Sequence, residues 1–390
     1  MFEYTIDIPT RVLFGAGKAA QLGDEASKYG KKAFVLMDPF LEGTDTAKKL
    51  LNNLSEHGID YIDRYDVTPN PRNTVVDKLS KECIDEKCDI VIGIGGGSCI
   101  DSAKMIGVVA ANGEEAWLYT ARDNEYVAQP NNPPLPIITL PTTSGTGTEV
   151  TCYAVLNNLE LETKGVMINR AICPLVSIVD PELTMTVPPQ VTALTGIDAF
   201  AHAFESYIDK KRTPFSQMIA LEAIRLFAKS IRKAVKNGND VQARSDMSLC
   251  SLLAGIAITH CPTVMPHAMG QPLSGLTDAP HGGSIACCIC QIIEWTLPYG
   301  AEQFAVVAEI FDPSIKDLSV EEKAAKLPVI LKELWDDILT EPVTMSKYGL
   351  KESEIERLAD NMLVYYTLDL HGHPRMATRE DLIGIIKKCM

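Results

Sequence analysis

The sequence predicts an α/β domain of the Rossmann-like type followed by a domain built only of helices. Short apolar runs alternate with helical stretches as far as residue 179, and two of these runs lead into glycine-rich turns. Beyond residue 188 the apolar spacing is almost entirely helical. With 390 residues, the chain is also too long for a single hydrophobic core. We therefore expect one domain over residues 1–184 and another over residues 185–390.

The first candidate for nucleotide binding follows the first extended run, residues 2–14. Residues 15–20 fit the dinucleotide fingerprint G-x-G-x-x-A and lead into a helical stretch over residues 18–29. A strand over residues 33–37 then brings Asp38, at about the 20-residue spacing of that fingerprint. A carboxylate at a strand end accepts hydrogen bonds from ribose hydroxyls and repels a 2′-phosphate, so Asp38 predicts NAD rather than NADP.

A second glycine loop competes for the same role. The apolar strand of residues 89–93 is followed by a helix that opens with Gly95, Gly96, Gly97 and Ser98. Because glycine has no Cβ, backbone N–H groups can approach a pyrophosphate at the positive end of the helix. Asp101 stands in a capping-box position, and we expect it to cap this helix rather than bind a ligand.

The rest of the first half ends in a polar loop and a last strand. Residues 131–140 end in a strand, and residues 141–149 form a loop rich in threonine and glycine, a composition that many plain turns share. Residues 172–179 are the last strand-like run, and Pro188 and Pro189 interrupt the chain before the next helix. Further helices are expected over residues 214–236, 244–259, 301–311, 320–339 and 351–363.

Candidate metal ligands occur in the predicted helical domain. Asp198 and His202 lie four residues apart in TGIDAFAHAFESY, which places both on one face of a helix. Such a pair alone is more often a surface hydrogen bond. His267 and His281 follow beside proline and glycine in apolar stretches, where an unpaired ring would be costly to bury. Together, one Asp and three His suit a divalent transition metal.

Composition excludes several classes of function. The net charge of −15 argues against nucleic acid or an anionic membrane surface as a partner. No run reaches the roughly 18 to 20 apolar residues of a membrane span, and the N-terminal residues lack the pattern of a secretory signal. Eleven scattered cysteines indicate reduced thiols. We therefore expect a cytoplasmic enzyme.

Five motifs, in this order along the chain, resemble the iron-containing (group III metal-dependent) alcohol dehydrogenases. They are IGGGSCIDSAK, LPTTSGTGTEV, TGIDAFAHAFESY, PHAMGQPLSG and APHGG. The resemblance covers nearly the whole chain. It implies an NAD-binding α/β domain and an all-helical metal-binding domain, with the active site in a cleft between the two. It also implies a homodimer or a larger homo-oligomer joined through the N-terminal strand, and the alternative for this strand is an ordinary edge strand. Fe(II) is the metal that it implies first, and these ligands would also take Zn.

The resemblance also assigns individual residues. It gives the cofactor phosphates to residues 95–98 rather than residues 15–20, and it makes Asp198, His202, His267 and His281 the metal ligands. It further implies cofactor contacts at Asn70, Gly96, Gly97, Ser98, Thr142, Thr143, Thr146, Thr151, Tyr153, Lys164 and Leu183. Lys164 would reach the ribose hydroxyls, and the alternative for it is an ordinary surface lysine.

One position departs from the family pattern. The family usually has a second histidine four residues after the first in this motif, and here that residue is Gln271. Glutamine forms hydrogen bonds but does not titrate, so it cannot be a general base. Acid–base groups contribute less to the rate than a metal does, and we expect turnover to survive the change. Gln271 is instead a candidate contact to the substrate.

The sequence thus predicts a metal-dependent, NAD(H)-linked alcohol dehydrogenase or aldehyde reductase acting on a small primary alcohol or aldehyde. One alternative is a lyase of the same fold that resembles dehydroquinate synthase. That lyase needs basic residues for a phosphate-bearing substrate, and the cluster of residues 210–212 is more simply a solvated helix end. The other alternative is a nucleotide-binding scaffold without catalysis.

Overall fold

The computed structural model describes residues 3–120 and 127–390, which form two compact units. The α/β unit comprises residues 8–143 and 147–186. The helical unit contains residues 187–390 together with two short segments, 3–7 and 144–146. Neither of these two segments was predicted to belong with the helical half. As a division into folding domains, the boundary between residues 184 and 185 stays a prediction.

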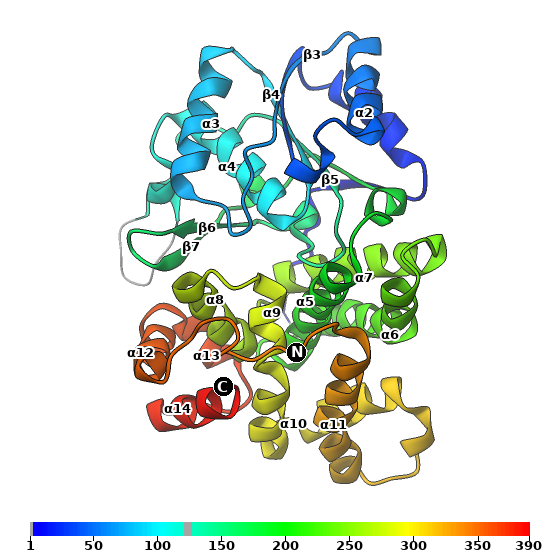
Figure 1. Ribbon diagram of the computed structural model, residues 1–390, viewed down its shortest axis with the longest axis vertical. Coiled ribbons are helices and arrows are strands. Elements are labelled where there is room, and N and C mark those ends of the chain that lie inside the picture. The colour runs from blue at the N-terminus through cyan, green and yellow to red at the C-terminus, as the bar shows by residue number, and fades with distance from the viewer. Residues whose placement is uncertain (1–2, 121–126) are drawn as a thin grey trace. The chain divides into compact units, whose positions relative to one another are not determined.

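The α/β unit is built on a six-stranded parallel sheet with the order β1-β8-β5-β4-β2-β3 (Figure 1). Its strands are β1 (Arg11–Phe14), β2 (Lys32–Met37), β3 (Asp60–Arg64), β4 (Ile90–Gly95), β5 (Ile137–Pro141) and β8 (Val176–Val179). Met37 pairs with Ile94, and Gly95 pairs with Pro141. The carboxyl ends of β2, β4 and β5 therefore lie level with one another. Residues that follow these three strands meet at one edge of the sheet.

Helices cover both faces of this sheet. The helices are α1 (Leu22–Ala26), α2 (Asp45–Glu56), α3 (Asn73–Asp85) and α4 (Gly97–Asn112). The alternation along β2 shows the division, because Val35 and Met37 pack in one core with α1 and α2. Phe34 and Leu36 pack in the other core with α3 and α4. A strand buried on both faces reads as a continuous apolar run, which is why β2 was recognisable in the sequence.

Three details of the α/β unit differ from the prediction. Within the described residues, the strand expected over 2–14 exists only as β1, since β8 offers partners only from Arg11 onward; residue 2 lies outside the described residues. The helix expected over 18–29 is a 3-10 turn, η1 (Lys18–Gln21), followed by the short α1. An antiparallel hairpin of β6 (Tyr153–Asn158) and β7 (Thr163–Ile168) is absent from the prediction.

The helical unit contains ten α-helices among the described residues. They are α5 (Pro189–Ile208), α6 (Pro214–Lys236), α7 (Val241–His260), α8 (Met265–Thr277), α9 (His281–Ala286), α10 (Ile289–Phe311), α11 (Val320–Ile338), α12 (Ile355–Tyr365), α13 (Thr367–Gly372) and α14 (Arg379–Lys388). The prediction for α6 is confirmed at both ends. The helix expected over 301–311 is only the second half of α10, which continues through Pro298.

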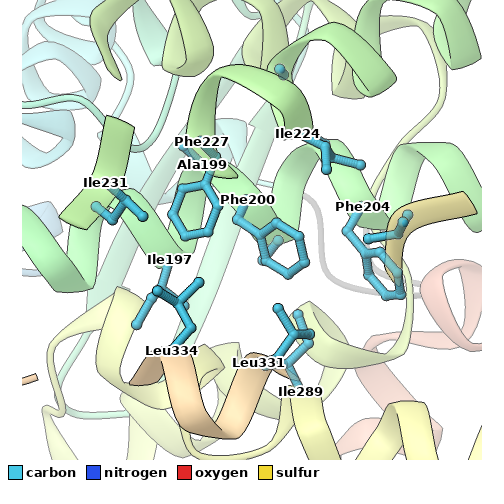
Figure 2. Packing of buried hydrophobic residues seen from close by; sticks show 14 of the residues in the cluster. Ile197, Ala199, Phe200, Phe204, Ile224, Phe227, Ile231, Ile289, Leu331 and Leu334 are labelled. Atoms are coloured by element: carbon cyan, nitrogen blue, oxygen red, sulfur yellow. The ribbon is translucent and has the colours of Figure 1, made fainter. Parts of the chain in front are cut away.

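Helix α5 is the centre of the helical unit. Phe200 stacks on Phe204 and on Phe227 of α6, with ring centroids 5.6 and 5.1 Å apart, and Leu331 and Leu334 of α11 close the cluster (Figure 2). Aromatic rings at these separations add specific geometry to the burial of apolar area. This packing fixes the rotation of α5 about its axis, and so fixes the direction of its polar face.

None of the helices in the described part of the chain is alone long and apolar enough to cross a membrane. Taken together, α7 and α8 meet the criterion by length and composition, but they are bent by 103° at the break between them. The cysteines are all free.

Candidate active site

The polar face of α5 carries three side chains of the site. Asp198, His202 and Glu205 follow the spacing i, i+4 and i+7, which aligns them along one stripe of a helix. Phe200 and Phe204 project from the other side into the core. The alternation of small and large residues in this helix therefore places the stripe in the interior, where all three polar residues are buried.

Four side chains converge at this stripe, and we name Asp198, His202, His267 and His281 the metal cluster. One ligand atom from each lies within 4.8 Å of all the others. The Oδ1 atom of Asp198 is 3.4 Å from Nε2 of His281, 3.6 Å from Nε2 of His267 and 3.9 Å from Nε2 of His202. The structure thus brings together all four residues named from the sequence. It is the only such group of His, Cys, Asp and Glu among the described residues.

The metal cluster fits a divalent ion because a carboxylate oxygen and three ring nitrogens face one another at 3.4 to 3.9 Å. Asp198 Oδ1 and His267 Nε2 are buried and have no hydrogen-bond partner among the described residues. Burial outweighs the attraction of Asp198 and lowers the pKa of His202 to about 4, so this ring is neutral at pH 7 and one of its nitrogens keeps a lone pair for a metal. Buried polar groups without partners are rare in folded proteins and mark places where a ligand is missing.

Glu205 is a buried residue of the site that the sequence analysis missed. Its Oε1 lies 2.6 Å from Nδ1 of His267, and its Oε2 accepts the backbone N–H groups of Val264 at 2.7 Å and His267 at 3.3 Å. Burial opposes a charge on His267, but Glu205 and Asp198 outweigh it and raise the pKa of this ring to about 10. A carboxylate that holds the far nitrogen of a ligating histidine is a recurrent feature of metal sites. Its position at i+7 from Asp198 was the available signal.

Gln271 lies on α8 one turn beyond His267. Its side-chain Oε1 is buried and has no hydrogen-bond partner among the described residues. Gly270 beside it packs against Ser284 and Ile285 of α9, the helix that begins with His281. The two helices that carry His267 and His281 are therefore in close contact at this position.

The glycine loop, residues 95–98, lies at the carboxyl end of β4. Asp38 follows β2 next to it, and its Oδ2 accepts the Gly96 N–H at 2.5 Å and the Thr142 hydroxyl at 3.5 Å. A Cβ at Gly95 would collide with the Asp38 carboxylate. Burial raises the pKa of Asp38, and the bonds from Gly96 and Thr142 oppose this effect. Thus Asp38 is bonded to the glycine loop, and only glycine fits at position 95 because the Asp38 carboxylate approaches it so closely.

At the other candidate loop, residues 15–20, the backbone N–H groups are already bonded to a carboxylate of the protein. The Asp180 carboxylate accepts the backbone N–H groups of Gly17 at 3.2 Å and Ala19 at 2.9 Å. These are the groups that a phosphate would use at such a turn. By contrast, the first N–H groups of α4 at Gly97 and Ser98 have no acceptor within their helix.

Asp101 does not cap α4, so that prediction was wrong. The N-cap residue is Gly96, and no side chain caps the helix. Asp101 instead points away from the helix start and accepts the Thr148 hydroxyl at 2.5 Å and the Val155 N–H at 3.0 Å. A capping box is a local pattern, and here the tertiary contacts with the chain leading into β6 outweigh it.

Lys104, one turn further along α4, is a second residue that the sequence analysis missed. Its ammonium group is completely buried and donates to Thr148 Oγ1 at 2.9 Å, to the Thr151 carbonyl at 2.9 Å and to the Tyr153 carbonyl at 2.8 Å. Burial lowers the pKa of Lys104, and the Asp101 carboxylate opposes this effect. With Asp101, Lys104 fixes the segment of residues 148–155, which includes two predicted cofactor contacts.

The other predicted cofactor residues occupy several places. Lys164 on β7 is buried and donates to the Asn70 amide oxygen at 2.8 Å, so it is not a surface lysine. Asn70 has a left-handed backbone conformation with φ of 55°. Thr143 lies against the glycine loop, since a Cβ at Gly96 would stand 3.3 Å from its hydroxyl. Thr146 belongs to the segment that packs with the helical unit, and Leu183 lies in the 3-10 turn η6 (Pro181–Thr184).

Comparison with known proteins covers the whole chain. The family profile described as iron-containing alcohol dehydrogenase matches residues 9–181, and the profile described as the C-terminal domain of the Fe-containing alcohol dehydrogenase family matches residues 192–390. The NAD-dependent methanol dehydrogenase of Bacillus methanolicus is 32% identical over 98% of this chain and 99% of its own length. The 1,3-propanediol dehydrogenase of Klebsiella pneumoniae is 34% identical over 100% and 98%. A crystal structure of an archaeal halo-thermophilic alcohol dehydrogenase from a Red Sea brine pool superimposes with a TM-score of 0.94 at 29% identity, covering both chains completely.

Proposed function

We infer the reaction from the family to which the chain belongs, and that family is the iron-containing alcohol dehydrogenases. The protein is a metal-dependent, NAD(H)-linked oxidoreductase that interconverts small primary alcohols and aldehydes. The lyase and the scaffold alternatives gain no support, since both relatives named above are dehydrogenases that match along nearly their whole length.

The metal cluster is proposed to hold the divalent ion, with Fe(II) as the first candidate and Zn as the alternative. The observation that carries this assignment is the approach of three Nε2 atoms to Asp198 Oδ1 at 3.4 to 3.9 Å. When bound, the ion acts as a Lewis acid toward the substrate oxygen, while NAD(H) accepts or supplies the hydride. Asp198 contributes the single negative charge of the ligand set. Glu205 holds the His267 ring so that Nε2 faces the cluster.

The cofactor is proposed to bind along the carboxyl edge of the parallel sheet. Gly96, Gly97 and Ser98 would face the pyrophosphate, and Asp38 would accept the adenosine ribose hydroxyls. The occupation of the rival turn by Asp180 supports this choice of loop. Lys164, positioned by Asn70, would bind the other ribose. The remaining proposed contacts are Thr142, Thr143, Thr146, Thr151, Tyr153 and Leu183.

We also propose that the protein acts in the cytoplasm as a homodimer. The free cysteines support a reducing compartment. The N-terminal segment exposes Tyr4, Ile6 and Ile8 at 45%, 51% and 43% of their surface, an alternation suited to pairing with a second copy. Light scattering after size-exclusion chromatography should give twice the chain mass. An Ile6→Ser variant should shift it toward the monomer, and a monomeric wild type would refute the dimer.

Removal of the metal tests the proposed reaction directly. The purified protein would be stripped with a chelator without oxygen, then reloaded with Fe(II) or Zn, and NADH formation from a small alcohol would be followed at each stage. We expect the stripped protein to lose at least about 99% of its rate and the reloaded protein to recover it. Equal rates before and after stripping would contradict the assignment of the metal cluster.

A further inference from the structure

A short segment of the polar loop, residues 144–146, packs with the helical unit although its flanks belong to the α/β unit. The Ser144 hydroxyl lies 3.1 Å from the Ser248 hydroxyl of α7, and the two buried side chains form a hydrogen bond. A Cβ at Gly145 would stand 2.8 Å from the Cβ of Thr195 in α5 and 2.9 Å from the carbonyl oxygen of the same residue. Only glycine therefore lets the loop approach α5 so closely.

The part of α5 that this segment contacts lies beside the metal cluster. Thr195 precedes Asp198 by three residues, which is less than one turn of the helix. Burial lowers the pKa of His202, whereas the nearby Gly145 backbone acts to raise it, so the segment also borders this ring. Residues 144–146 therefore support the helix that supplies two of the four proposed metal ligands.

The flanks of this segment carry proposed cofactor contacts. On one side, the Thr142 N–H donates to the carbonyl of Gly95 at 3.0 Å. On the other, the Thr148 hydroxyl accepts from the Lys104 ammonium group at 2.9 Å. A cofactor bound at these flanks fixes the loop, and a fixed loop holds residues 144–146 against α5. Metal binding needs the same arrangement of α5, so each ligand lowers the cost of ordering the protein for the other.

We propose that residues 144–146 couple the two sites, so that a bound cofactor raises the affinity of the metal cluster for its ion and a bound ion raises the affinity for the cofactor by the same factor. This inference rests on the proposed function, to which it adds that the two ligands bind cooperatively. Ser144, Gly145 and Ser248 are positioning residues in this scheme. Coupling between two sites changes affinities by about 5- to 150-fold, and for one short segment we expect about tenfold.

Binding of Zn²⁺ and NADH to the metal-free, full-length protein tests the proposal without turnover. Competition with a coloured chelator measures the Zn²⁺ affinity with and without saturating NADH, and NADH fluorescence measures the reciprocal effect. We expect each ligand to tighten the other about tenfold, and amide hydrogen exchange in residues 141–149 to slow when either one binds. Affinities that do not depend on the other ligand would overturn the coupling alone. A protein that binds neither ligand would refute the proposed function, and the coupling with it.

Variants of the hydroxyl pair separate this route from direct contact between the two bound ligands. Ser144→Ala and Ser248→Ala each remove one partner of the same bond, so either variant, and the two combined, should reduce the coupling to about twofold. Ser80→Ala removes a buried hydroxyl that donates to the Val76 carbonyl of α3 at 2.7 Å, and this matched control should retain the full coupling. Full coupling in all of these variants would show that it arises between the ligands themselves and would refute the role of residues 144–146.

Discussion

The metal cluster and the segment held by Lys104 are both buried and polar, but they differ in whether their polar atoms are hydrogen-bonded. In the helical unit, Asp198 Oδ1 and His267 Nε2 lack hydrogen-bond partners among the described residues. In the α/β unit, Lys104 donates to the Thr148 hydroxyl and to two carbonyl groups, and Asp101 accepts from both a hydroxyl and a backbone N–H. The metal cluster therefore has buried atoms that a ligand could bind, whereas the polar groups of Lys104 and Asp101 are already hydrogen-bonded within the protein.

The difference has an energetic consequence. Leaving a buried polar group without a partner costs about 1 to 3 kcal/mol, so the metal cluster is a place where folding stability is lower until an ion binds. The groups around Lys104 carry no such cost and instead hold the backbone that the cofactor is proposed to touch. Substitutions in the first region should therefore affect ligand binding with little loss of stability. Substitutions in the second should affect stability first.

The largest effect is expected for Asp198→Asn. The variant loses the only negative charge among the four ligands, and we expect the metal content to fall to trace levels and kcat/KM to fall about 1,000-fold. Because Asp198 Oδ1 has no hydrogen-bond partner among the described residues, the variant loses only the attraction between Asp198 and the His267 ring, and the melting temperature of the metal-free protein should fall by less than in the control variant below. Metal analysis, NADH formation and calorimetry measure the three quantities.

The matched control for this prediction is Asp246→Asn in α7. Asp246 is also buried, but it accepts from Ser230 at 2.5 Å and from Gln242 at 2.8 Å and pairs with Lys229. The same substitution there should lower the melting temperature and leave the metal content intact. If both variants lose stability equally, the distinction between the two kinds of buried polar group is wrong.

A smaller effect is expected for Glu205→Gln, which tests how the cluster is held. The variant keeps the size of the side chain but loses the anion that fixes Nδ1 of His267 at 2.6 Å. Removal of such a supporting group weakens metal binding by about 10- to 100-fold. Competition with a coloured chelator measures the affinity. Glu25→Gln in the α/β unit, another buried carboxylate, should leave it unchanged, and an unchanged affinity in Glu205→Gln would exclude a positioning role.

The sequence named the four residues that the structure brings together in the metal cluster, whereas it missed Glu205, which holds one of them. Asp198 and His202 share a helix, so their relation follows from helical spacing alone, and the scarcity of histidine pointed to His267 and His281. The role of Glu205 could be predicted only by knowing that α8 packs beside α5, because its partners are backbone and ring atoms of residues 264–267. No local pattern contains that packing. Only the relation between Asp198 and His202 follows from local spacing, whereas the approach of His267 and His281 and the contacts of Glu205 depend on how the helices pack.

Lys104→Met is predicted to affect stability more than cofactor binding. The variant removes the ammonium group that donates to the Thr151 and Tyr153 carbonyls and that compensates the buried Asp101 charge, and leaving a buried charge without its compensating partner costs about 3 to 5 kcal/mol. We expect KM for NAD to rise roughly tenfold, which corresponds to about 1.4 kcal/mol of binding. Urea unfolding and NAD titration measure the two effects.

Two further variants separate charge from shape at Lys104. Addition of Asp101→Asn should recover part of the lost stability, because no unpaired buried charge then remains. Lys32→Met removes a partly exposed ion pair with Glu86 and should change stability by at most about 1 kcal/mol. A Lys104→Met protein as stable as wild type would show that the hydrogen bonds of this lysine contribute little.

The fold itself shows the same limit on prediction from sequence. Strands β2, β4 and β5 are buried on both faces, and their apolar runs were recognisable without knowledge of their neighbours. Residues 3–9 have a suitable alternation, but none of the strands in the described part of the chain lies beside them, so they form no ladder. The hairpin of β6 and β7 contains Asn157, Asn158 and Lys164, polar residues that obscured its pattern and are buried by contacts distant in the sequence.

The smallest effect is expected at Asp38, whose carboxylate is hydrogen-bonded within the protein and is also proposed to contact the cofactor. Its Oδ2 is bonded to Gly96 and Thr142, and its charge is proposed to repel a 2′-phosphate. Asp38→Asn keeps the shape and an acceptor but removes the charge, and a charge pair near the surface is worth about 1 kcal/mol at 4 Å in water. The ratio of kcat/KM for NADP to that for NAD should therefore rise about fivefold, whereas Asp45→Asn at the start of α2 should not change it.

The same ratio should depend on pH in the wild type. Because burial raises the pKa of Asp38, lowering the pH should raise the ratio by protonating the carboxylate. In the Asp38→Asn variant, only the 2′-phosphate of NADP can still titrate. If the ratio for NADP over NAD changes with pH in the same way in both proteins, Asp38 does not select the cofactor.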